Sequence, residues 1–203
     1  MPRDYQEILA PNLYYDRQFD IEAAKIMPGE YYVTTRDMLV VTVLGSCVSA
    51  CLRDRTNGIG GMNHFMLPHS DNDPKNPLST SARYGTYAME ILINHLLKLG
   101  AKRNNLEAKV FGGGNILHGF TVTNVGLRNA DFVLDFLHTE KIAVAAQSLL
   151  DIHPRKVYYF PRTGRALVRN LKSVHNNTIV EREREYESHL DYAKVSGEVE
   201  LFR

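Results

Sequence analysis

Four short runs of β-branched and aromatic residues follow one another in the first third of this chain. They cover residues 31–34, 38–44, 48–52 and 61–67. This composition favours β-strands, and Asn57-Gly58 between the third and fourth runs is a strong hairpin signal. The second run is strongly apolar and leads directly through Gly45-Ser46 to Cys47. We therefore predict closely connected strands, with a cysteine presented at a turn between two of them.

The rest of the chain mixes helix and strand signals. A helix is predicted over residues 80–99 and ends at Gly100. A second helix is predicted to start at an Asn129 cap. Strands are predicted at 109–111, which lead into Gly112-Gly-Gly114, and at 142–150, and a hairpin is predicted from 156–160 and 165–169. Residues 71–77 have the composition of a loop. This order predicts an α/β domain. The apolar positions that support the two helices are Tyr84, Ala88, Ile91, Leu92, Leu96 and Leu99, and then Phe132, Val133, Phe136 and Leu137.

Composition indicates one folded domain with polar ends. The chain has 203 residues, of which 44% are hydrophobic and 23% charged, and this balance suits a real core. We interpret residues 1–28 as an N-terminal extension, 29–172 as the domain and 173–203 as a charged C-terminal tail. Within that tail, the alternating charges of residues 181–185 are predicted to form a solvated surface.

The charge and the termini exclude several classes of protein. A formal net charge of +1 implies no strong attraction to nucleic acid. The N-terminus lacks the apolar core of a signal peptide, and the apolar run 38–44 is too short to span a bilayer. Two cysteines make no disulfide framework, which favours a reducing compartment. We expect a soluble, cytoplasmic protein that does not insert into membranes.

Cys47 and His64 are the best candidates for chemistry. A thiol needs a base to become a nucleophile at neutral pH, and such a pair is the general signature of covalent catalysis by cysteine. The turn near Asn57-Gly58 lets the strand after Cys47 return with His64 beside it. The alternative is that Cys47 is a small buried hydrophobe, which is also the interpretation we favour for Cys51.

Other site types have weaker support. Cys47, Cys51 and His64 lack the paired ligand spacing of structural zinc, so no metal is expected. Gly112-Gly-Gly114 is not followed by the Lys-Ser/Thr of a phosphate loop. Close backbone packing near the active site or an ordinary glycine turn explains these glycines instead. A papain-like peptidase lacks its expected cysteine-neighbour motif.

Several motifs in order resemble the CheD-type chemoreceptor glutamine deamidases. They are Leu44-Gly-Ser-Cys-Val48, Gly60-Gly-Met-Asn-His-Phe-Met-Leu-Pro68, Phe111-Gly-Gly-Gly-Asn115 and Asn124-Val-Gly-Leu-Arg-Asn129. The resemblance covers roughly residues 30–170. It implies a compact single domain with mixed β-sheets flanked by helices, similar to the catalytic domain of deamidating bacterial toxins. It also implies hydrolysis of selected glutamine side chains to glutamate in the cytoplasmic helices of methyl-accepting chemotaxis receptors.

The implied chemistry assigns roles to individual residues. Cys47 would attack the carboxamide, and His64 would act as base and then as acid. Backbone N–H groups around Gly45 and Ser46 would stabilise the oxyanion, with no cofactor. Gly113, Gly114, Asn115 and Arg128 are candidates for the substrate groove.

The third member of the site is the least determined. The resemblance calls for a threonine just upstream of the cysteine to orient His64, and Thr42 lies five positions before Cys47. Residues five apart in a regular strand point to opposite faces, so Thr42 can serve only if the chain turns at Gly45-Ser46. Ser46 and Thr35 are the substitutes.

Two functions stay open at this point. The leading one is a protein-glutamine glutaminase that forms a thioester on Cys47, a route that would also accept an ester. The alternative is an adaptor that binds a CheC-type phosphatase in chemotaxis signalling, as some members of the family do. An adaptor has no need of a nucleophile and a base, so the reactivity of the Cys47 thiol separates the two.

Overall fold

A computed structural model describes residues 12–68, 79–115, 125–172 and 177–192. Its helices are α2 (Thr80–Lys98), α3 (Val125–Thr139) and α4 (Asn177–Tyr192), with one 3₁₀ turn at Arg103–Asn105. Its strands are β1 (Asn12–Asp16), β2 (Ile21–Lys25), β3 (Tyr31–Thr34), β4 (Leu39–Leu44), β5 (Val48–Asp54), β6 (Gly60–Asn63), β7 (Leu106–Gly112), β8 (Ala143–Leu149), β9 (Arg155–Phe160) and β10 (Arg165–Asn170).

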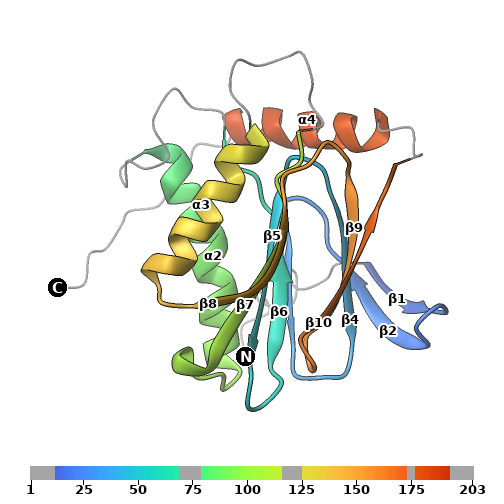
Figure 1. Ribbon diagram of the computed structural model, residues 1–203, viewed down its shortest axis with the longest axis vertical. Helices are drawn as coiled ribbons and strands as arrows, with labels where there is room; N and C mark the ends of the chain where they lie inside the picture. Colours follow the sequence, from blue (N-terminus) through green and yellow to red (C-terminus); the bar gives the residue numbers. More distant parts are fainter. Residues whose placement is uncertain (1–11, 69–78, 116–124, 173–176, 193–203) are drawn as a thin grey trace.

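The strands form two five-stranded sheets. The first sheet has the order β1-β2-β4-β9-β10 and the second has the order β3-β6-β5-β7-β8. Each sheet is mixed, because β2 pairs with β4 and β7 pairs with β8 in parallel while the other pairs are antiparallel. Helices α2 and α3 cover one face of the second sheet, and α4 crosses one end of the strands (Figure 1). The predicted α/β domain with mixed sheets is confirmed.

Alternation along β5 separates the two main parts of the core. Val48, Ala50 and Leu52 pack with residues of α2 and α3 on one side of the second sheet. Cys51 points the other way and packs with first-sheet residues such as Val40 and Tyr159. Successive side chains of a strand alternate between its faces, so one short strand contributes to both layers. The residues around Cys47 thus belong to the layer between the two sheets.

The first predicted helix is confirmed, with one exception in its apolar stripe. Ser79 caps α2 by accepting a hydrogen bond from the Ala82 N–H at 3.0 Å. Gly100 follows the helix with a φ of +103°, a left-handed conformation that glycine adopts without strain. Leu96 is fully buried, whereas Leu99 is 39% exposed because it lies beyond the last helical residue.

Two local predictions need correction, and one cannot be compared. The run at 61–67 is not one strand: β6 ends at Asn63, and Phe65 then forms an isolated bridge with Val48. Asn129 does not cap α3, which begins at Val125. Asn129 lies inside the helix, and its side-chain amide bonds the Ser46 carbonyl and the Leu67 N–H. The loop predicted at 71–77 lies outside the described residues.

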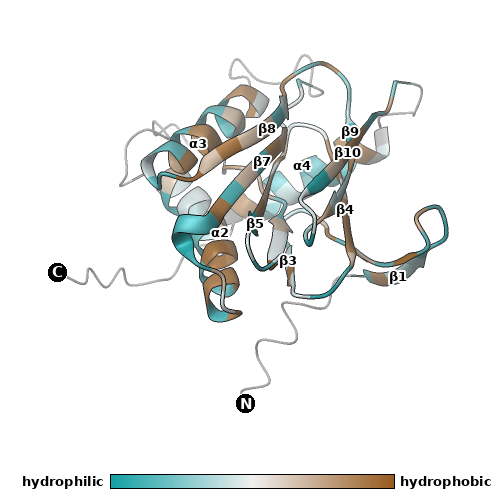
Figure 2. Ribbon diagram, turned by 60° about the horizontal axis from the view of Figure 1, so that its bottom comes forward, coloured by the Kyte–Doolittle hydropathy of each residue, from teal (hydrophilic) through white to brown (hydrophobic). Residues whose placement is uncertain are grey.

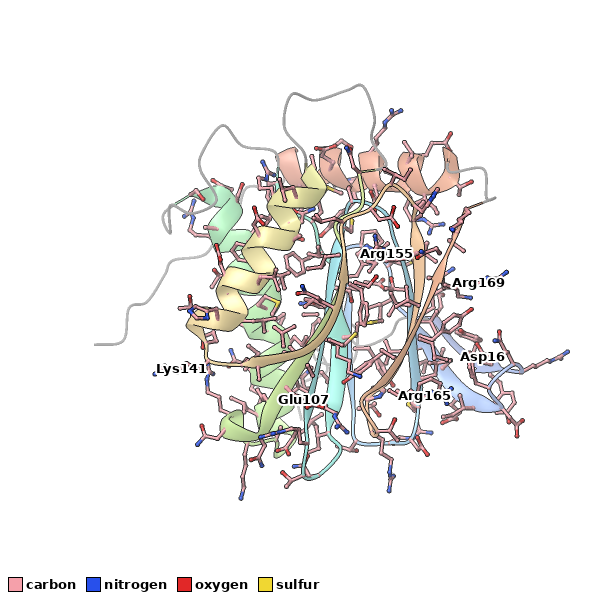
Figure 3. The ribbon with its side chains drawn as sticks, viewed as in Figure 1. Asp16, Glu107, Lys141, Arg155, Arg165 and Arg169 are labelled. Carbon is pink, nitrogen blue, oxygen red and sulfur yellow. The ribbon has the colours of Figure 1, made fainter. Side chains whose placement is uncertain are left out.

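Both ends of the chain contribute to the fold where they are described. The predicted N-terminal extension supplies β1 and β2, and β2 pairs in parallel with β4. The predicted C-terminal tail forms α4, which is mainly hydrophilic in Figure 2, in contrast to the central strands. The two sheets are also tied together at the start of β9, where Arg155 donates a 3.0 Å hydrogen bond to Ser148 Oγ at the end of β8 (Figure 3).

Candidate active site

Residues 45–47, the Cys47 loop, carry the chain from one sheet to the other. Strand β4 of the first sheet ends at Leu44, and β5 of the second sheet begins at Val48. The chain therefore turns at Gly45-Ser46, which is the condition that the assignment of Thr42 required, and Thr42 and Cys47 do not lie on one continuous strand. The crossing brings Thr42 of the first sheet and Cys47, at the entry to the second sheet, into the layer between the two sheets.

Every carbonyl of the Cys47 loop has a hydrogen-bond donor. The Gly45 carbonyl accepts from the Gly114 N–H at 2.7 Å, and the Cys47 carbonyl accepts from the Gly113 N–H at 2.8 Å. The Ser46 carbonyl accepts from Asn129 Nδ2 at 2.8 Å. These bonds fix the orientation of the loop peptides, and the N–H groups of the loop do not take part in them.

Close packing of glycines supports this arrangement. Gly112 has a φ of +109°, and a Cβ there would lie 2.1 Å from the Cys47 carbonyl oxygen. A Cβ on Gly126 of α3 would lie 2.4 Å from the Gly113 carbonyl oxygen. The prediction of close backbone packing near Cys47 is confirmed. Because the N–H groups of Gly113 and Gly114 are bonded to the Cys47 loop, they are not free to bind a phosphate.

Asn129 is a supporting residue that the sequence argument misassigned. It is fully buried in α3, and its side chain also accepts a hydrogen bond from the Leu67 N–H at 2.9 Å. It thereby connects the Cys47 loop to the segment that follows His64. The available signal was a polar residue on the same helical stripe as the buried Val133 and Leu137.

Cys47 and His64 face the same layer. Val48 and Phe65 exchange backbone hydrogen bonds of 2.9 and 3.0 Å. Opposite residues in an antiparallel pair share a face, so the residues that precede them, Cys47 and His64, share the other face. The His64 backbone is held further, since its N–H donates to the Glu30 carbonyl at 2.9 Å.

Thr42 contacts His64 and determines which ring nitrogen carries the proton. Thr42 Oγ1 lies 2.7 Å from His64 Nδ1 and 2.9 Å from the Ile26 carbonyl oxygen. A carbonyl only accepts, so the threonine hydrogen goes to Ile26 and the hydroxyl accepts from Nδ1–H. His64 Nε2 is then the unprotonated nitrogen, and this buried atom has no hydrogen-bond partner among the described residues.

The two residues considered as substitutes for Thr42, Thr35 and Ser46, lie in other environments. Thr35 is exposed in the turn after β3, and the Ser46 hydroxyl donates to Glu183. The predicted groove residues also have structural partners. Arg128 donates to the Pro68 carbonyl at 2.5 Å, and the Asn115 N–H donates to the Asp151 carbonyl at 2.7 Å.

A buried carboxylate from α4 fills the Cys47 loop. Glu183 Oε1 accepts from the N–H groups of Gly45 at 2.9 Å and Cys47 at 3.3 Å. Its Oε2 accepts from the Ser46 N–H at 2.8 Å and from Ser46 Oγ at 2.7 Å. The prediction of a solvated charge run holds for Glu181 and Glu185, which are exposed, but is wrong for Glu183, which is 2% exposed. Charge alternation alone does not reveal that one carboxylate has backbone donors elsewhere in the chain.

Burial controls the ionisation of both candidate catalytic groups. Burial raises the pKa of the Cys47 thiol well above its usual range, and the negative charge of Glu183 raises it further. Burial lowers the pKa of His64 to about 3, with a smaller contribution from the positive charge of Arg182. In this arrangement the cysteine is a thiol and the histidine is a neutral imidazole. Cys51 is buried as predicted, so burial alone does not distinguish the two cysteines.

A small cavity of about 110 Å³ lies beside His64. Its walls come from the turn before β3, from β6 and from α2, and they include Gly29, Tyr84 and Tyr87. Within the described ranges, no group of three or more His, Cys, Asp or Glu side chains is placed to hold a metal ion. The helices of these same ranges also lack the combination of length and apolarity needed to cross a membrane.

Comparison with known proteins identifies the family. Residues 66–170 match the family model described as CheD chemotactic sensory transduction. A protein of Thiobacillus denitrificans, named probable chemoreceptor glutamine deamidase CheD, is 67% identical over 97% of this chain and 98% of its own length. A protein of the same name from Methylobacillus flagellatus is 62% identical over the full length of both chains. The chain therefore belongs to the CheD family.

Proposed function

We propose that this protein hydrolyses glutamine side chains of chemoreceptors to glutamate, with Cys47 as the nucleophile. The observation that carries the proposal is the carboxylate held by the N–H groups of the Cys47 loop. A glutamate side chain is the product of this reaction, and the loop binds that group through the donors that an oxyanion would need. The names of the relatives support the same activity.

The reaction starts with proton transfer and nucleophilic attack. His64 Nε2 takes the proton of the Cys47 thiol, and Sγ forms a bond to the carboxamide carbon of the substrate. The N–H groups of the Cys47 loop stabilise the oxyanion of the tetrahedral intermediate. The C–N bond then breaks, and His64 gives its proton to the leaving nitrogen, which departs as ammonia.

Hydrolysis of the thioester completes the cycle. His64 Nε2 takes a proton from water as the water oxygen attacks the thioester carbon. The C–S bond breaks, glutamate is released, and the sulfur recovers a proton from His64. Thr42 acts as a positioning residue throughout, because its hydroxyl keeps Nδ1 protonated and Nε2 free to carry the moving proton.

The proposed substrate is a glutamine on a helical segment of a receptor's cytoplasmic region. Binding energy from residues that flank the glutamine can position its carboxamide over Cys47, which free glutamine cannot supply. A purely adaptor role, such as binding a CheC-type phosphatase, gives no reason for the bond between Thr42 and His64 or for a buried Nε2 atom that has no partner in the described part of the chain.

The test is incubation with a purified cytoplasmic receptor fragment and mass spectrometry of its glutamines. We expect glutamine-to-glutamate conversion with the native protein and none with Cys47→Ala. Free glutamine and a short glutamine peptide, supplied at the same glutamine concentration, should release ammonia more slowly. Equal rates with all three compounds would contradict a protein substrate and indicate a small-molecule amidase.

A further inference from the structure

Helix α4 covers the candidate active site through one face. The residues that this face contributes recur at helical spacing and are Ile179, Glu183, Tyr186 and Leu190. Glu181, Arg184 and Glu185 are exposed on the other face. Figure 1 shows α4 lying across the ends of the strands above the junction of the two sheets. The site is therefore covered by a helix whose Glu183 carboxylate is bound in the Cys47 loop.

The fit of Glu183 is chemically specific. A buried carboxylate is costly unless it is hydrogen-bonded, and both oxygens of Glu183 have donors from the Cys47 loop. Tyr186, one turn further along α4, packs against Gly29 and shares a hydrogen bond with Tyr84. The contacts therefore extend from the Cys47 loop to the wall of the cavity beside His64.

In this arrangement Cys47 is closed to a substrate. Cys47 is 0% exposed and His64 is 2% exposed while α4 is in place. A glutamine carboxamide has the size and shape of the Glu183 carboxylate, and it needs the same N–H groups during attack. A substrate can therefore reach Cys47 only when Glu183 has left the loop. Release of α4 also exposes the buried side chains of Ile179 and Leu190, so apolar burial holds the helix in place together with the Glu183 carboxylate.

We propose that α4 is an internal ligand of the active site, and that a helix presenting a glutamine displaces it to reach Cys47. The inference rests on the proposed function and specifies its substrate: a helical segment whose glutamine enters the place of Glu183. The internal helix and the substrate helix compete for one surface. The apparent affinity for the substrate is then the intrinsic affinity multiplied by the fraction of molecules in which α4 is released.

The first experiment measures deamidation of a receptor cytoplasmic fragment by Glu183→Ala and by Glu185→Ala. The second variant is the matched control, because it removes an exposed carboxylate from the same helix. Loss of hydrogen bonds to a charged group should free the site, so we expect Glu183→Ala to lower KM by about tenfold with kcat unchanged. Tyr186→Ala should also lower KM, and it leaves the hydrogen bonds of the Cys47 loop unchanged.

The second experiment does not depend on catalysis. The chain has two cysteines, so Cys51→Ala leaves Cys47 as the single thiol for alkylation by iodoacetamide. In this background we expect Glu183→Ala and Tyr186→Ala to react about tenfold faster than the parent. Glu185→Ala should react at the parental rate. Circular dichroism of each variant verifies that the fold is retained.

The outcomes separate this inference from the proposed function. Equal alkylation of the parent, Glu183→Ala and Tyr186→Ala would overturn the covering role of α4, even if the receptor fragment is deamidated. A loss of kcat in Glu183→Ala at saturating fragment would also overturn it, because Glu183 would then take part in the reaction. If alkylation separates the variants but no protein converts the fragment, the deamidase proposal fails while α4 remains the ligand of the Cys47 loop.

Discussion

Thr42 is the residue for which the structure makes the sharpest prediction. Thr42→Val keeps the shape of the side chain and removes the hydroxyl that bonds both Ile26 and His64. A buried donor left without a partner costs about 1–3 kcal/mol, and His64 Nδ1–H would be such a donor. The free energy of unfolding should fall by that amount, as measured by urea denaturation.

The effect on catalysis follows from the tautomer of His64. Without the hydroxyl, protonation of Nδ1 is no longer enforced, and the Nε2 atom is not held ready to accept the thiol proton. A loss of about 1.4–2.8 kcal/mol of transition-state stabilisation corresponds to a kcat lower by about tenfold to a hundredfold. The kcat of His64→Ala should fall further, by at least about a hundredfold.

Thr42→Ser is the matched control, because it retains the hydroxyl and removes one methyl group. We expect its kcat for the receptor fragment to stay within about threefold of the native value, with a stability cost of about 1 kcal/mol. Nitrogen NMR of labelled His64 should report Nδ1 protonation in the native protein and in Thr42→Ser, and a mixture of tautomers in Thr42→Val. A fully active Thr42→Val, or a Thr42→Ser as impaired as the valine variant, would refute the positioning role.

Three further predictions concern the nucleophile, its support and pH. Cys47→Ala should abolish deamidation of the receptor fragment while Cys51→Ala keeps most of it, and the reverse pattern would show that the wrong cysteine was chosen. Gly112→Ala should lose more free energy of unfolding in urea than Gly100→Ala, because both glycines have positive φ but only Gly112 would place its Cβ against a carbonyl oxygen. The backbone strain alone costs about 1–2 kcal/mol. Equal losses of stability in the two variants would contradict the packing argument. Because His64 stays neutral in the fold to a pKa of about 3 and an unfolded histidine takes up a proton near pH 6.5, the free energy of unfolding should decrease as pH falls from 6.5 toward 3. In His64→Gln this dependence should be weaker between pH 6.5 and 4.5, and an unchanged slope would exclude His64 as its source.

Local patterns predicted most of the secondary structure. Strands β3, β4 and β5, helix α2 and the hairpin of β9 and β10 follow from side-chain types at neighbouring positions and from turn residues such as Gly58. These signals are readable because they act over a few residues, through backbone preference and alternation of burial. The failures at residues 61–67 and at Asn129 arose where a tertiary partner outweighed the local preference.

The candidate site could be anticipated only in part. The motifs around Cys47 and His64 indicated a nucleophile and a base, and the glycines at 112–114 indicated close packing. The resemblance also suggested Thr42 as the partner of His64, but the geometry of that contact and the position of Glu183 could not be read from any window of sequence. Thr42 and His64 are 22 positions apart, and Gly45 and Glu183 are 138 positions apart.

The amino-acid sequence alone was enough to indicate an α/β domain with a cysteine and a histidine poised for thiol chemistry. Its three-dimensional arrangement was needed to show that Thr42 contacts the histidine and that Glu183 occupies the Cys47 loop. The physical reason is that these contacts join two sheets and a distant helix. A threonine in a strand and a glutamate in a charge run look ordinary until folding removes water from them and leaves particular polar groups as their partners.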